Sequence, residues 1–338
     1  MTEPGSSPKS PAAPPPPNAG RVLVLAGGLS HERDVSLRAG RRVAEALRSA
    51  GMDVEVRDVD STLVPALRSD PPACVFPLLY GESGEDGTLR EVLELVGVPY
   101  VGSRPAASRL AFDKPVAKEV VSRAGLSTPD SVTLPHETFR EVGATALMAA
   151  LIDRLGQPLV VKPTRGGSAL GCSVVAEAAE MPGAMVGCFA YGPFALVERF
   201  VRGTEVTVSV VDSGRGPQAL PAVEIRPMEG TYDYSARYTA GATEFVAPAK
   251  LDDAEAAQIA SMAVTAHEAL GLSHLSRTDL IIDEAGVPWF LEVNVAPGMT
   301  ETSLLPLAVE AAGLDLGQLC ADLVAVAVAP PGVGTRID

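Results

Sequence analysis

Two carboxylates, an amide and an arginine stand close together in the sequence, at Asp279, Glu292, Asn294 and Arg277. Carboxylate and amide oxygens are the ligands that Mg²⁺ prefers, and a protein-bound Mg²⁺ usually keeps several waters and binds substrate phosphates. Two carboxylates about 5 Å apart repel each other and are costly to bury unless a cation lies between them. These residue types indicate a metal site for a phosphorylated substrate, and a solvated polar face is the alternative.

Two predicted strands bring these four residues to one face. The apolar runs 278–283 and 288–294 surround Ala285 and Gly286, which is typical of an antiparallel hairpin. A two-residue loop, or a four-residue loop over 284–287, places the two carboxylates opposite each other and the arginine opposite the asparagine. Because strand side chains alternate, all four then share a face. Their apolar neighbours, and their position far from the turn, favour the metal site.

A second candidate binding feature follows the hairpin directly. Gly298 permits a turn whose backbone N–H approaches a ligand closely. Ser303 stands at the N-cap of a helix predicted over 303–312, where free N–H groups and the helix dipole favour a carboxylate; ordinary capping is the alternative. Earlier in the chain, the glycine-containing segment 82–87 carries three acids, so it predicts a turn into a helix near Thr88 and not an anion cradle.

Alternating strands and helices must position these groups. The apolar run 22–26 ends in a Gly-Gly pair, which indicates a buried parallel strand leading into a tight turn. The loop 163–171 lies between two predicted strands, with Cys172 where a P-loop has lysine, so it is not a P-loop. The other predicted elements are strands at 54–59, 73–79, 159–162, 172–175, 195–201 and 205–211, helices at 38–50, 105–124, 253–270 and 316–328, and a helical stretch near 137–155.

The order of these elements divides the chain into three units of an α/β (α+β) fold. The first unit, 21–104, is a βαβ layer, the second covers 105–197, and the third, 198–329, carries the hairpin. Residues 1–20, with seven prolines, predict a disordered tail, and 330–338 predict a short loose one.

Composition excludes several classes of function. The chain has 27 Lys and Arg, of which five are lysines, against 42 Asp and Glu, and its net charge of −15 would repel nucleic acid and anionic membranes. No apolar run reaches the roughly 18–20 residues of a membrane span, and the N-terminus lacks the apolar core of a signal peptide. We therefore expect no nucleic-acid or membrane partner and a cytoplasmic location. Four widely spaced cysteines predict buried free thiols, and four histidines without ligand spacing predict structural or surface residues.

Five motifs in order resemble the D-alanine–D-alanine ligase family of the ATP-grasp fold, over about residues 21–328. These motifs are 27–36, 84–89, 162–168, 232–234 with Tyr238, and 292–300. The resemblance implies an N-terminal Rossmann-like (pre-ATP-grasp) α/β domain that binds substrate at 21–104. It implies a central ATP-grasp subdomain at 105–197 and a C-terminal ATP-grasp subdomain with the metal site at 198–329.

The resemblance also implies a role for each matching residue. Those that match ATP ligands are Lys114, Lys162, Glu198, Val201 and Glu205. Those that match the ligands of two Mg²⁺ (or Mn²⁺) ions are Asp279, Glu292 and Asn294. Those that match catalytic residues, which hold the first D-alanine, close a loop over it and stabilise the oxyanion, are Glu32, Ser168, Tyr238, Arg277 and Gly298. Ser303 and Leu304 match the recognition point for the carboxylate of the second D-alanine.

The implied reaction joins two D-alanines through a D-alanyl phosphate, with ATP as co-substrate, for peptidoglycan precursors, and relatives are commonly homodimers. Two departures concern the substrate site: Tyr80 stands where the family commonly has histidine, and Arg237 replaces the lysine before the loop tyrosine. We expect both to modulate activity and not to disable it, with Tyr80 acting on the first substrate.

Three alternatives remain at this point. A D-alanine–D-lactate or D-alanine–D-serine ligase of the same family shares the reaction, although Tyr238 favours an amine nucleophile. A non-catalytic nucleotide-binding paralogue is disfavoured by the retained acids and Arg277. A nicotinamide dehydrogenase would need a GxGxxG motif after the first strand, which has Gly-Gly-Leu-Ser-His-Glu instead.

Overall fold

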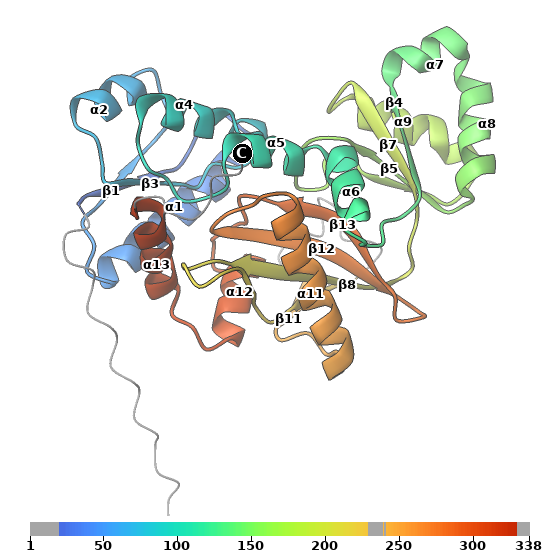
Figure 1. Cartoon of the computed structure of the whole chain (residues 1–338). Helices are drawn as coiled ribbons and strands as arrows, with labels where there is room; N and C mark the ends of the chain where they lie inside the picture. The colour runs from blue at the N-terminus through green and yellow to red at the C-terminus, as the bar shows by residue number, and fades with distance from the viewer. Residues whose placement is uncertain (1–19, 229–238, 240, 330–338) are drawn as a thin grey trace, which may run out of the picture.

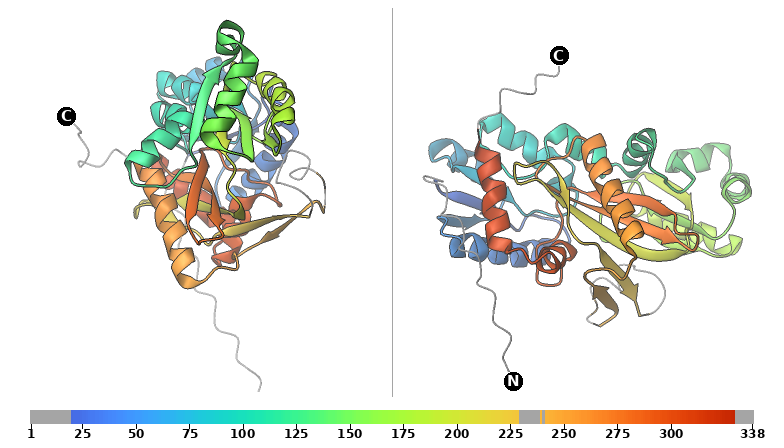
Figure 2. Two further views of the ribbon diagram at one scale, coloured as in Figure 1. Left: turned by 90° about the vertical axis from the view of Figure 1, so that its right-hand side faces the viewer. Right: turned by 60° about the horizontal axis from the view of Figure 1, so that its bottom comes forward.

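The computed structural model describes residues 20–228, 239 and 241–329, and it contains three β-sheets with helices packed around them (Figure 1). The mixed α/β class is therefore confirmed. The largest sheet lies between the two smaller units (Figures 1 and 2). The predicted tails lie almost wholly outside the described residues, and so do Arg237, Tyr238 and the motif 232–234.

The first unit is built on three parallel strands in the order β2-β1-β3. The central strand β1 (Val22–Leu25) is buried along its whole length, as its apolar run predicts. The predicted βαβ layer is confirmed, with α1 beginning earlier than expected. Its other elements are α1 (Arg33–Ser49), β2 (Val54–Arg57), α2 (Leu63–Ser69), β3 (Cys74–Pro77), α3 (Glu82–Glu85) and α4 (Thr88–Val96).

Ser36 of α1 fixes the turn that follows β1. Its hydroxyl accepts a hydrogen bond from the Gly27 N–H at 2.7 Å and donates one to the carbonyl of Leu78 at 2.6 Å. Gly27 has a φ of 115°, and a side chain there would collide with Asp58. The segment that leads to Glu32 is thereby anchored to the edge of the sheet.

The segment 105–124 is helical as predicted, but it forms two helices and not one. These are α5 (Pro105–Phe112) and α6 (Lys114–Arg123). Asp113 between them is extended, and its carboxylate accepts a hydrogen bond from the Val116 N–H at 3.4 Å. A capping aspartate followed by a proline in the first turn is a helix-start signal. The break makes Lys114 the first residue of α6.

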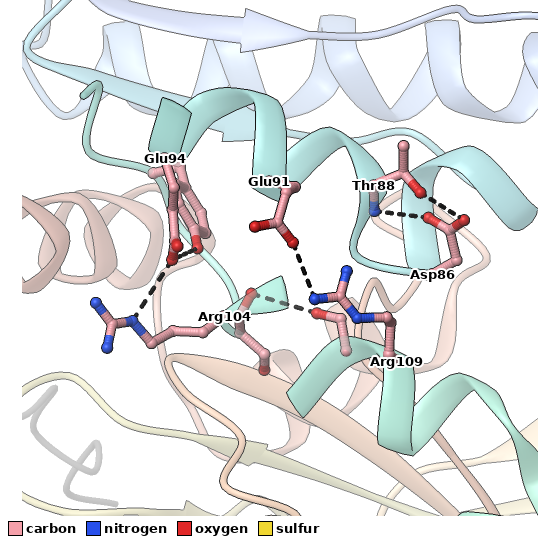
Figure 3. A network of polar contacts seen from close by, with 9 residues as sticks. Asp86, Thr88, Glu91, Glu94, Arg104 and Arg109 are labelled. Carbon is pink, nitrogen blue, oxygen red and sulfur yellow. Dashed lines mark hydrogen bonds and ion pairs between the residues drawn. The ribbon is translucent and has the colours of Figure 1, made fainter. Parts of the chain in front are cut away.

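Ion pairs on the surface connect α4 to the start of α5 (Figure 3). Arg109 Nη2 lies 2.9 Å from Glu91 Oε2, and Arg104 Nε lies 3.5 Å from Glu94 Oε1. Exposed pairs of this kind contribute about 0–1 kcal/mol each. The Arg109–Glu91 pair crosses the expected limit between the first two units at 104, whereas the Arg104–Glu94 pair lies within the first unit, and that limit stays a prediction.

The second unit is a four-stranded antiparallel sheet in the order β4-β7-β5-β6. The predicted helical stretch 137–155 is split at Gly143, which has a φ of 93°. Strand β4 and helix α9 were not predicted; β4 has no apolar run because it is largely exposed. The elements are β4 (Ser131–Pro135), α7 (His136–Val142), α8 (Ala144–Leu155), β5 (Leu159–Pro163), β6 (Ser173–Val175), a 3₁₀ turn (Ala178–Glu180), α9 (Met181–Phe189) and β7 (Phe194–Arg199).

The third unit is the large sheet, in the order β11-β10-β8-β12-β13 with β9 beside β8. The strands and helices predicted here are confirmed, except that the strand predicted at 195–201 is β7 and belongs to the second sheet; β9, β10 and β11 are additional. The elements are β8 (Gly203–Val211), β9 (Gln218–Ala219), β10 (Val223–Pro227), β11 (Thr243–Val246), α11 (Asp253–Ala269), β12 (Leu275–Asp283), β13 (Pro288–Asn294), α12 (Leu304–Ala311) and α13 (Leu316–Val328).

Hydrophobic cores join the three units. Val24 of β1 and Phe76 of β3 share one cluster with Leu305 of α12 and Val324 of α13, so the last two helices complete the core of the first unit. A second cluster packs α5, α6 and α11 onto the large sheet, and a third lies within the second unit. The helices that follow residue 104 thus share a core with the third unit, while the expected limit at 197 stays a prediction.

The cysteine and histidine predictions are largely confirmed. The four cysteines are free, and three of them are buried, whereas Cys172 is partly exposed, so its predicted burial is wrong. His31 and His136 lie at the surface, and His267 is buried.

Within the described part of the chain, no single helix is long and apolar enough to cross a membrane. The bent pair α12 and α13 passes that test only when the two helices are taken together, by length and composition.

The buried His267 gives a first testable prediction, on stability. Its Nδ1 lies 2.8 Å from the Ser276 hydroxyl, and burial lowers the pKa of His267 from 6.5 to about 4. The unfolded chain therefore binds a proton that the folded chain does not bind until about pH 4. The free energy of unfolding should fall as the pH drops from 7 to 4, with up to about 3 kcal/mol from this residue.

Urea unfolding at a series of pH values measures this contribution. His267→Gln, which cannot be protonated, should show a shallower fall than the unsubstituted chain over the same pH window. Parallel curves for the two proteins would contradict the assignment.

Candidate active site

The predicted pairing of the hairpin is confirmed where the chemically suited residues lie. Asp279 of β12 pairs with Glu292 of β13, and Arg277 pairs with Asn294. The two carboxylates therefore lie directly opposite each other on one face of the large sheet. That face looks into a cavity, so the alternative of a solvated hairpin face is wrong.

The loop of the hairpin differs from both predicted lengths. The Asp283 N–H donates to the carbonyl of Val287 at 2.9 Å, so three residues form the turn. A β-bulge at Leu291 adds one residue to β13 and restores the register before Glu292 is reached. Phe290 is fully buried in the core, whereas both Leu291 and Glu292 line the cavity. Leu291 is thus a lining residue that the sequence analysis missed.

Arg277 and Asp279 form a buried ion pair. Nε and Nη2 of Arg277 donate to Oδ1 and Oδ2 of Asp279 at 2.8 and 2.9 Å. The hydroxyl of Thr207, on the neighbouring strand β8, donates to the same Oδ1 at 2.9 Å. A bidentate pair holds the planar guanidinium in one orientation. Thr207 could not be found from sequence spacing, because it lies 72 residues away.

Lys114, at the start of α6, lies against the other carboxylate. Its Nζ is 3.2 Å from Glu292 Oε2 and donates to the carbonyl of Gly166 at 2.7 Å. The Gly166 carbonyl belongs to the loop between β5 and β6, so one ammonium group of α6 contacts both this loop and the large sheet. The break before α6 is what aims this side chain at the large sheet.

A chain of three buried charges lies behind this contact. Lys162 Nζ is 2.5 Å from Glu198 Oε1, and Lys118 Nζ is 2.7 Å from Glu198 Oε2. Burial alone would raise the pKa of Glu198, but the two lysines outweigh it and lower that pKa. Burial lowers the pKa of Lys118, whereas for Lys162 the nearby Glu198 and Glu292 outweigh burial and raise the pKa. Lys118 was missed, although it lies one helical turn from Lys114.

A cavity of about 500 Å³ opens between the second sheet and the large sheet, a size that suits a small-molecule ligand. Its apolar walls include Leu170, Ile281 and Leu291, which flank a row of charged side chains. The predicted site residues that line it are Lys114, Lys162, Glu198, Val201, Glu205, Asp279 and Glu292.

A second cavity of about 470 Å³ lies between the first unit and the large sheet. Lys114, Gly166, Gly167 and Glu292 line both cavities, so the two spaces meet at these residues. The other predicted site residues that line this one are Glu32, Ser168, Arg277, Asn294, Gly298, Ser303 and Leu304.

The loop between β5 and β6 reaches the first unit through Ser168. The Ser168 hydroxyl donates to Glu32 Oε1 at 2.5 Å, across 136 residues of sequence. Ser168 and Ala169 both have a φ of 55°, a conformation that costs energy for residues other than glycine. The Ser168–Glu32 contact predicted from the resemblance is therefore present, and its expected third member, Tyr238, lies outside the described residues.

The turn after β13 is held in place from three sides. Ser303 is the N-cap residue of α12, as predicted, but its hydroxyl accepts from the Thr300 N–H at 3.0 Å and makes no capping hydrogen bond, so the alternative of ordinary capping is wrong. A side chain at position 298 would collide with that hydroxyl, at 2.7 Å, so glycine is required there. Arg42 of α1 donates to the Thr300 carbonyl, and the Tyr80 hydroxyl accepts from the Met299 N–H at 3.2 Å.

Glu85 is a site residue that the sequence analysis missed. It is 7% exposed, lines the second cavity, and its Oε1 accepts from the Gly81 N–H at 2.9 Å. Burial, with Glu32 nearby, raises the pKa of Glu85 to about 7. The segment 82–87 does turn into a helix at Thr88 as predicted, but the turn itself is the short helix α3.

The donor set of the predicted metal site suits Mg²⁺ or Mn²⁺. Among the described residues, no three His, Cys, Asp or Glu side chains are grouped as metal ligands, and the predicted set has two carboxylates with Asn294 as its third member. The Asn294 Oδ1 accepts from the Ala296 N–H at 2.7 Å, which fixes the amide and leaves a second lone pair. Each carboxylate is already paired with a cationic side chain. Arg277 contacts Asp279, and Lys114 contacts Glu292, so this face attracts positive charge.

Comparison with known proteins gives a consistent result. Residues 120–325 match a family model described as the D-ala D-ala ligase C-terminus. The chain is 42% identical to a D-alanine–D-alanine ligase of Bordetella avium, over 90% of this chain and 94% of that protein. It resembles the solved VanG D-Ala:D-Ser ligase of Enterococcus faecalis, with a TM-score of 0.81, 30% identity and coverage of 91% of this chain and 99% of that one. A D-alanine–D-alanine ligase of Bacillus anthracis, solved in complex with ATP, gives a TM-score of 0.74 at 27% identity, with 92% of this chain and 97% of that one covered.

Proposed function

This chain belongs to the D-alanine–D-alanine ligase family, and from that membership we propose that it joins two D-alanines into D-alanyl-D-alanine while converting ATP to ADP and phosphate. The fold is the ATP-grasp fold with an N-terminal α/β domain. The enzyme is an ATP-dependent ligase, and its product serves peptidoglycan precursor synthesis.

One observation carries the proposal: two cavities of ligand size meet at Lys114, Gly166, Gly167 and Glu292. A ligase of this kind must bring the terminal phosphate of ATP to the carboxylate of an amino acid. A nucleotide in the first cavity and an amino acid in the second would bring these two reacting groups together at the junction.

The first cavity supplies groups for each part of ATP. Lys114 and Lys162 are the proposed phosphate ligands, because compact ammonium groups bind phosphate as point charges. Glu198 is the proposed acceptor for the adenine amino group, with Val201 lining the purine pocket. Glu205, which lines the opposite wall of this cavity, is the proposed ligand of the ribose hydroxyls.

The proposed metal ligands are Asp279, Glu292 and Asn294, for two Mg²⁺ or Mn²⁺ ions. When bound, these ions would neutralise the phosphate charge. The facing carboxylates and the fixed amide support this assignment.

In the second cavity, Glu32 is the proposed ligand for the ammonium group of the first D-alanine. Its hydrogen bond with Ser168 supports a role for that serine in holding the loop closed over the substrate. Tyr238 is the proposed third member of this set. Closure of the loop would exclude water, which otherwise hydrolyses an acyl phosphate.

The reaction proceeds in two transfers. A carboxylate oxygen of the first D-alanine attacks the γ-phosphorus of ATP, the bond from that phosphorus to the β–γ bridging oxygen breaks, and ADP leaves. The second D-alanine, as the free amine, then attacks the acyl carbon, and the resulting oxyanion is stabilised by Arg277 and the N–H of Gly298. The carbon–oxygen bond to phosphate breaks, and phosphate leaves as HPO₄²⁻ with the proton that the attacking amine gives up. Ser303 and Leu304 are the proposed recognition point for the carboxylate of this second substrate.

Measurement of phosphate release by the purified full-length chain tests the proposal. Release should require ATP, Mg²⁺ and D-alanine together, and mass spectrometry should find D-alanyl-D-alanine in equal amount. Glu32→Gln should raise the KM for the first D-alanine by about tenfold or more, because it removes a charge-assisted hydrogen bond to the ammonium group. Phosphate release without dipeptide, or no D-alanine dependence, would contradict the proposed function.

The same assay decides the second substrate. The enzyme is given D-alanine together with an equal concentration of D-lactate or D-serine at neutral pH. D-alanyl-D-alanine should be the main product in both mixtures. Predominance of D-alanyl-D-lactate or D-alanyl-D-serine would replace the proposed product while keeping the reaction class.

We propose the cytoplasm as the location and a homodimer as the assembly, with no nucleic-acid or membrane partner. Both proposed substrates, ATP and free D-alanine, are small polar molecules. The net charge of −15 disfavours polyanionic partners.

A further inference from the structure

Glu198 is paired with two buried lysines, Lys162 and Lys118. Lys162 is a proposed phosphate ligand, whereas Lys118 has no role in the proposed function so far. Lys118 Nζ lies 2.7 Å from Glu198 Oε2 and donates to the Pro129 carbonyl at 2.8 Å. Its side chain is 4% exposed, and it does not line the nucleotide cavity, whereas Glu198 and Lys162 do. Lys118 therefore cannot touch the nucleotide directly, although it is held by the residue proposed to bind adenine.

The two oxygens of Glu198 are divided between the two lysines. Oε1 faces Lys162 at 2.5 Å, and Oε2 faces Lys118 at 2.7 Å. A phosphate that enters the cavity must draw the Lys162 ammonium away from Glu198, at least in part. With Lys118 in place, Glu198 remains ion-paired through Oε2 after Lys162 has moved to the phosphate. Without Lys118, the exchange would leave a buried carboxylate without a compensating charge, which is strongly unfavourable.

We propose that Lys118 is a positioning residue for ATP binding, which keeps Glu198 paired and so frees Lys162 to bind the phosphates. The placement of Lys118 on α6 supports this role. Lys114 and Lys118 are four residues apart, on the same side of the helix, and both are buried towards the site. On this face of α6, the ammonium group of Lys114 thus contacts Glu292, and that of Lys118 contacts Glu198. This inference rests on the proposed function, because it assumes that ATP occupies the first cavity.

Lys118→Met tests the inference, since it keeps the length of the side chain and removes the charge. We expect the Kd for ADP and the KM for ATP to rise at least about tenfold, with the KM for D-alanine within twofold of the unsubstituted enzyme. Lys118→Arg keeps the charge and should restore most of the ATP affinity. The matched control is Lys250→Met, the same change at an exposed lysine, which should leave all three constants unchanged.

A double-mutant cycle separates positioning from simple destabilisation. Lys118→Met should have little further effect on ADP binding in a Glu198→Gln background, because the acid through which it acts is gone. The doubly substituted chain removes one cation and one anion together, so the net charge of this buried group is unchanged and Lys162 keeps Glu292 as a nearby acid. ADP binding therefore remains measurable even if Lys118→Met alone folds poorly.

The outcomes are distinguishable. Unchanged ADP and ATP constants in Lys118→Met, or effects of the two substitutions that add in full, would overturn the role of Lys118. If the unsubstituted chain binds neither ADP nor ATP, the proposed function itself fails.

Discussion

Asp279→Asn should lower the ligase turnover number by about 10²–10³-fold or more, although it replaces one oxygen by a similar-sized NH₂ group. The carboxylate of Asp279 accepts two hydrogen bonds from Arg277 and one from Thr207, and all three side chains are buried or nearly so. The amide cannot accept at both positions, so Arg277 loses its fixed orientation and part of its compensating charge. The proposed metal loses a charged ligand at the same time.

Steady-state measurement of phosphate release with saturating ATP and D-alanine gives this number. Asp283→Asn is the matched control, because Asp283 lies on the same strand, β12, and its carboxylate accepts hydrogen bonds from its own turn and from Trp289. It should retain turnover within about twofold. Turnover of Asp279→Asn within tenfold of the unsubstituted enzyme would contradict the assignment of this residue to the reaction centre.

Lys162→Arg should lose most of its ATP-dependent activity even though the charge is unchanged. We expect kcat/KM for ATP to fall about 10²-fold. A guanidinium group is planar, larger than an ammonium group and more weakly hydrated. The lysine side chain is 11% exposed, and its Nζ already lies 2.5 Å from Glu198, so the space for a fork-shaped group is small. An arginine there would push against Glu198 or project past the phosphates.

The measurement is kcat/KM for ATP at saturating D-alanine, with Lys250→Arg as the matched control at an exposed position. A circular-dichroism melting curve checks that Lys162→Arg stays folded at the assay temperature. Near-normal kinetics in a folded Lys162→Arg protein would refute the requirement for a compact ammonium group.

Local patterns in the sequence predicted the face of the hairpin but not its details. Asp279 and Glu292 do lie opposite each other, yet the turn has a length that neither prediction allowed. The error in the turn is offset by the bulge at Leu291, which no periodicity reveals, because an extra residue is defined only by its partner strand. The pairing was therefore right although the predicted loop was wrong.

Elements with a local signal were predicted better than those without one. The buried strands β1 and β5 are continuous apolar runs. β4 and β11 are short and half exposed, so neither has the run or the clean alternation that identifies a strand. The break at Asp113 had a signal, a capping aspartate with Pro115 two residues later, which the prediction of one helix over 105–124 did not use.

The tertiary contacts of the site were beyond reach of the sequence pattern alone. Lys118 meets Glu198 across 80 residues, and Thr207 meets Asp279 across 72. The resemblance to the family supplied Ser168 with Glu32, but it gave no reason to single out Lys118 or Glu85. Buried polar pairs between distant elements depend on how sheets pack, and the residue types at each end are also common on surfaces.

The shared core of the first and last segments has a consequence for biosynthesis. One face of the β1–β3 layer packs against α1 and α13, and about 240 residues separate the end of β3 from the start of α13. At ribosomal rates this gap corresponds to roughly 10–50 s. During that interval the cluster around Val24 and Phe76 lacks the side chains of α13, and it is complete only when that helix has left the ribosome. The growing chain thus keeps part of this apolar core uncovered until translation ends.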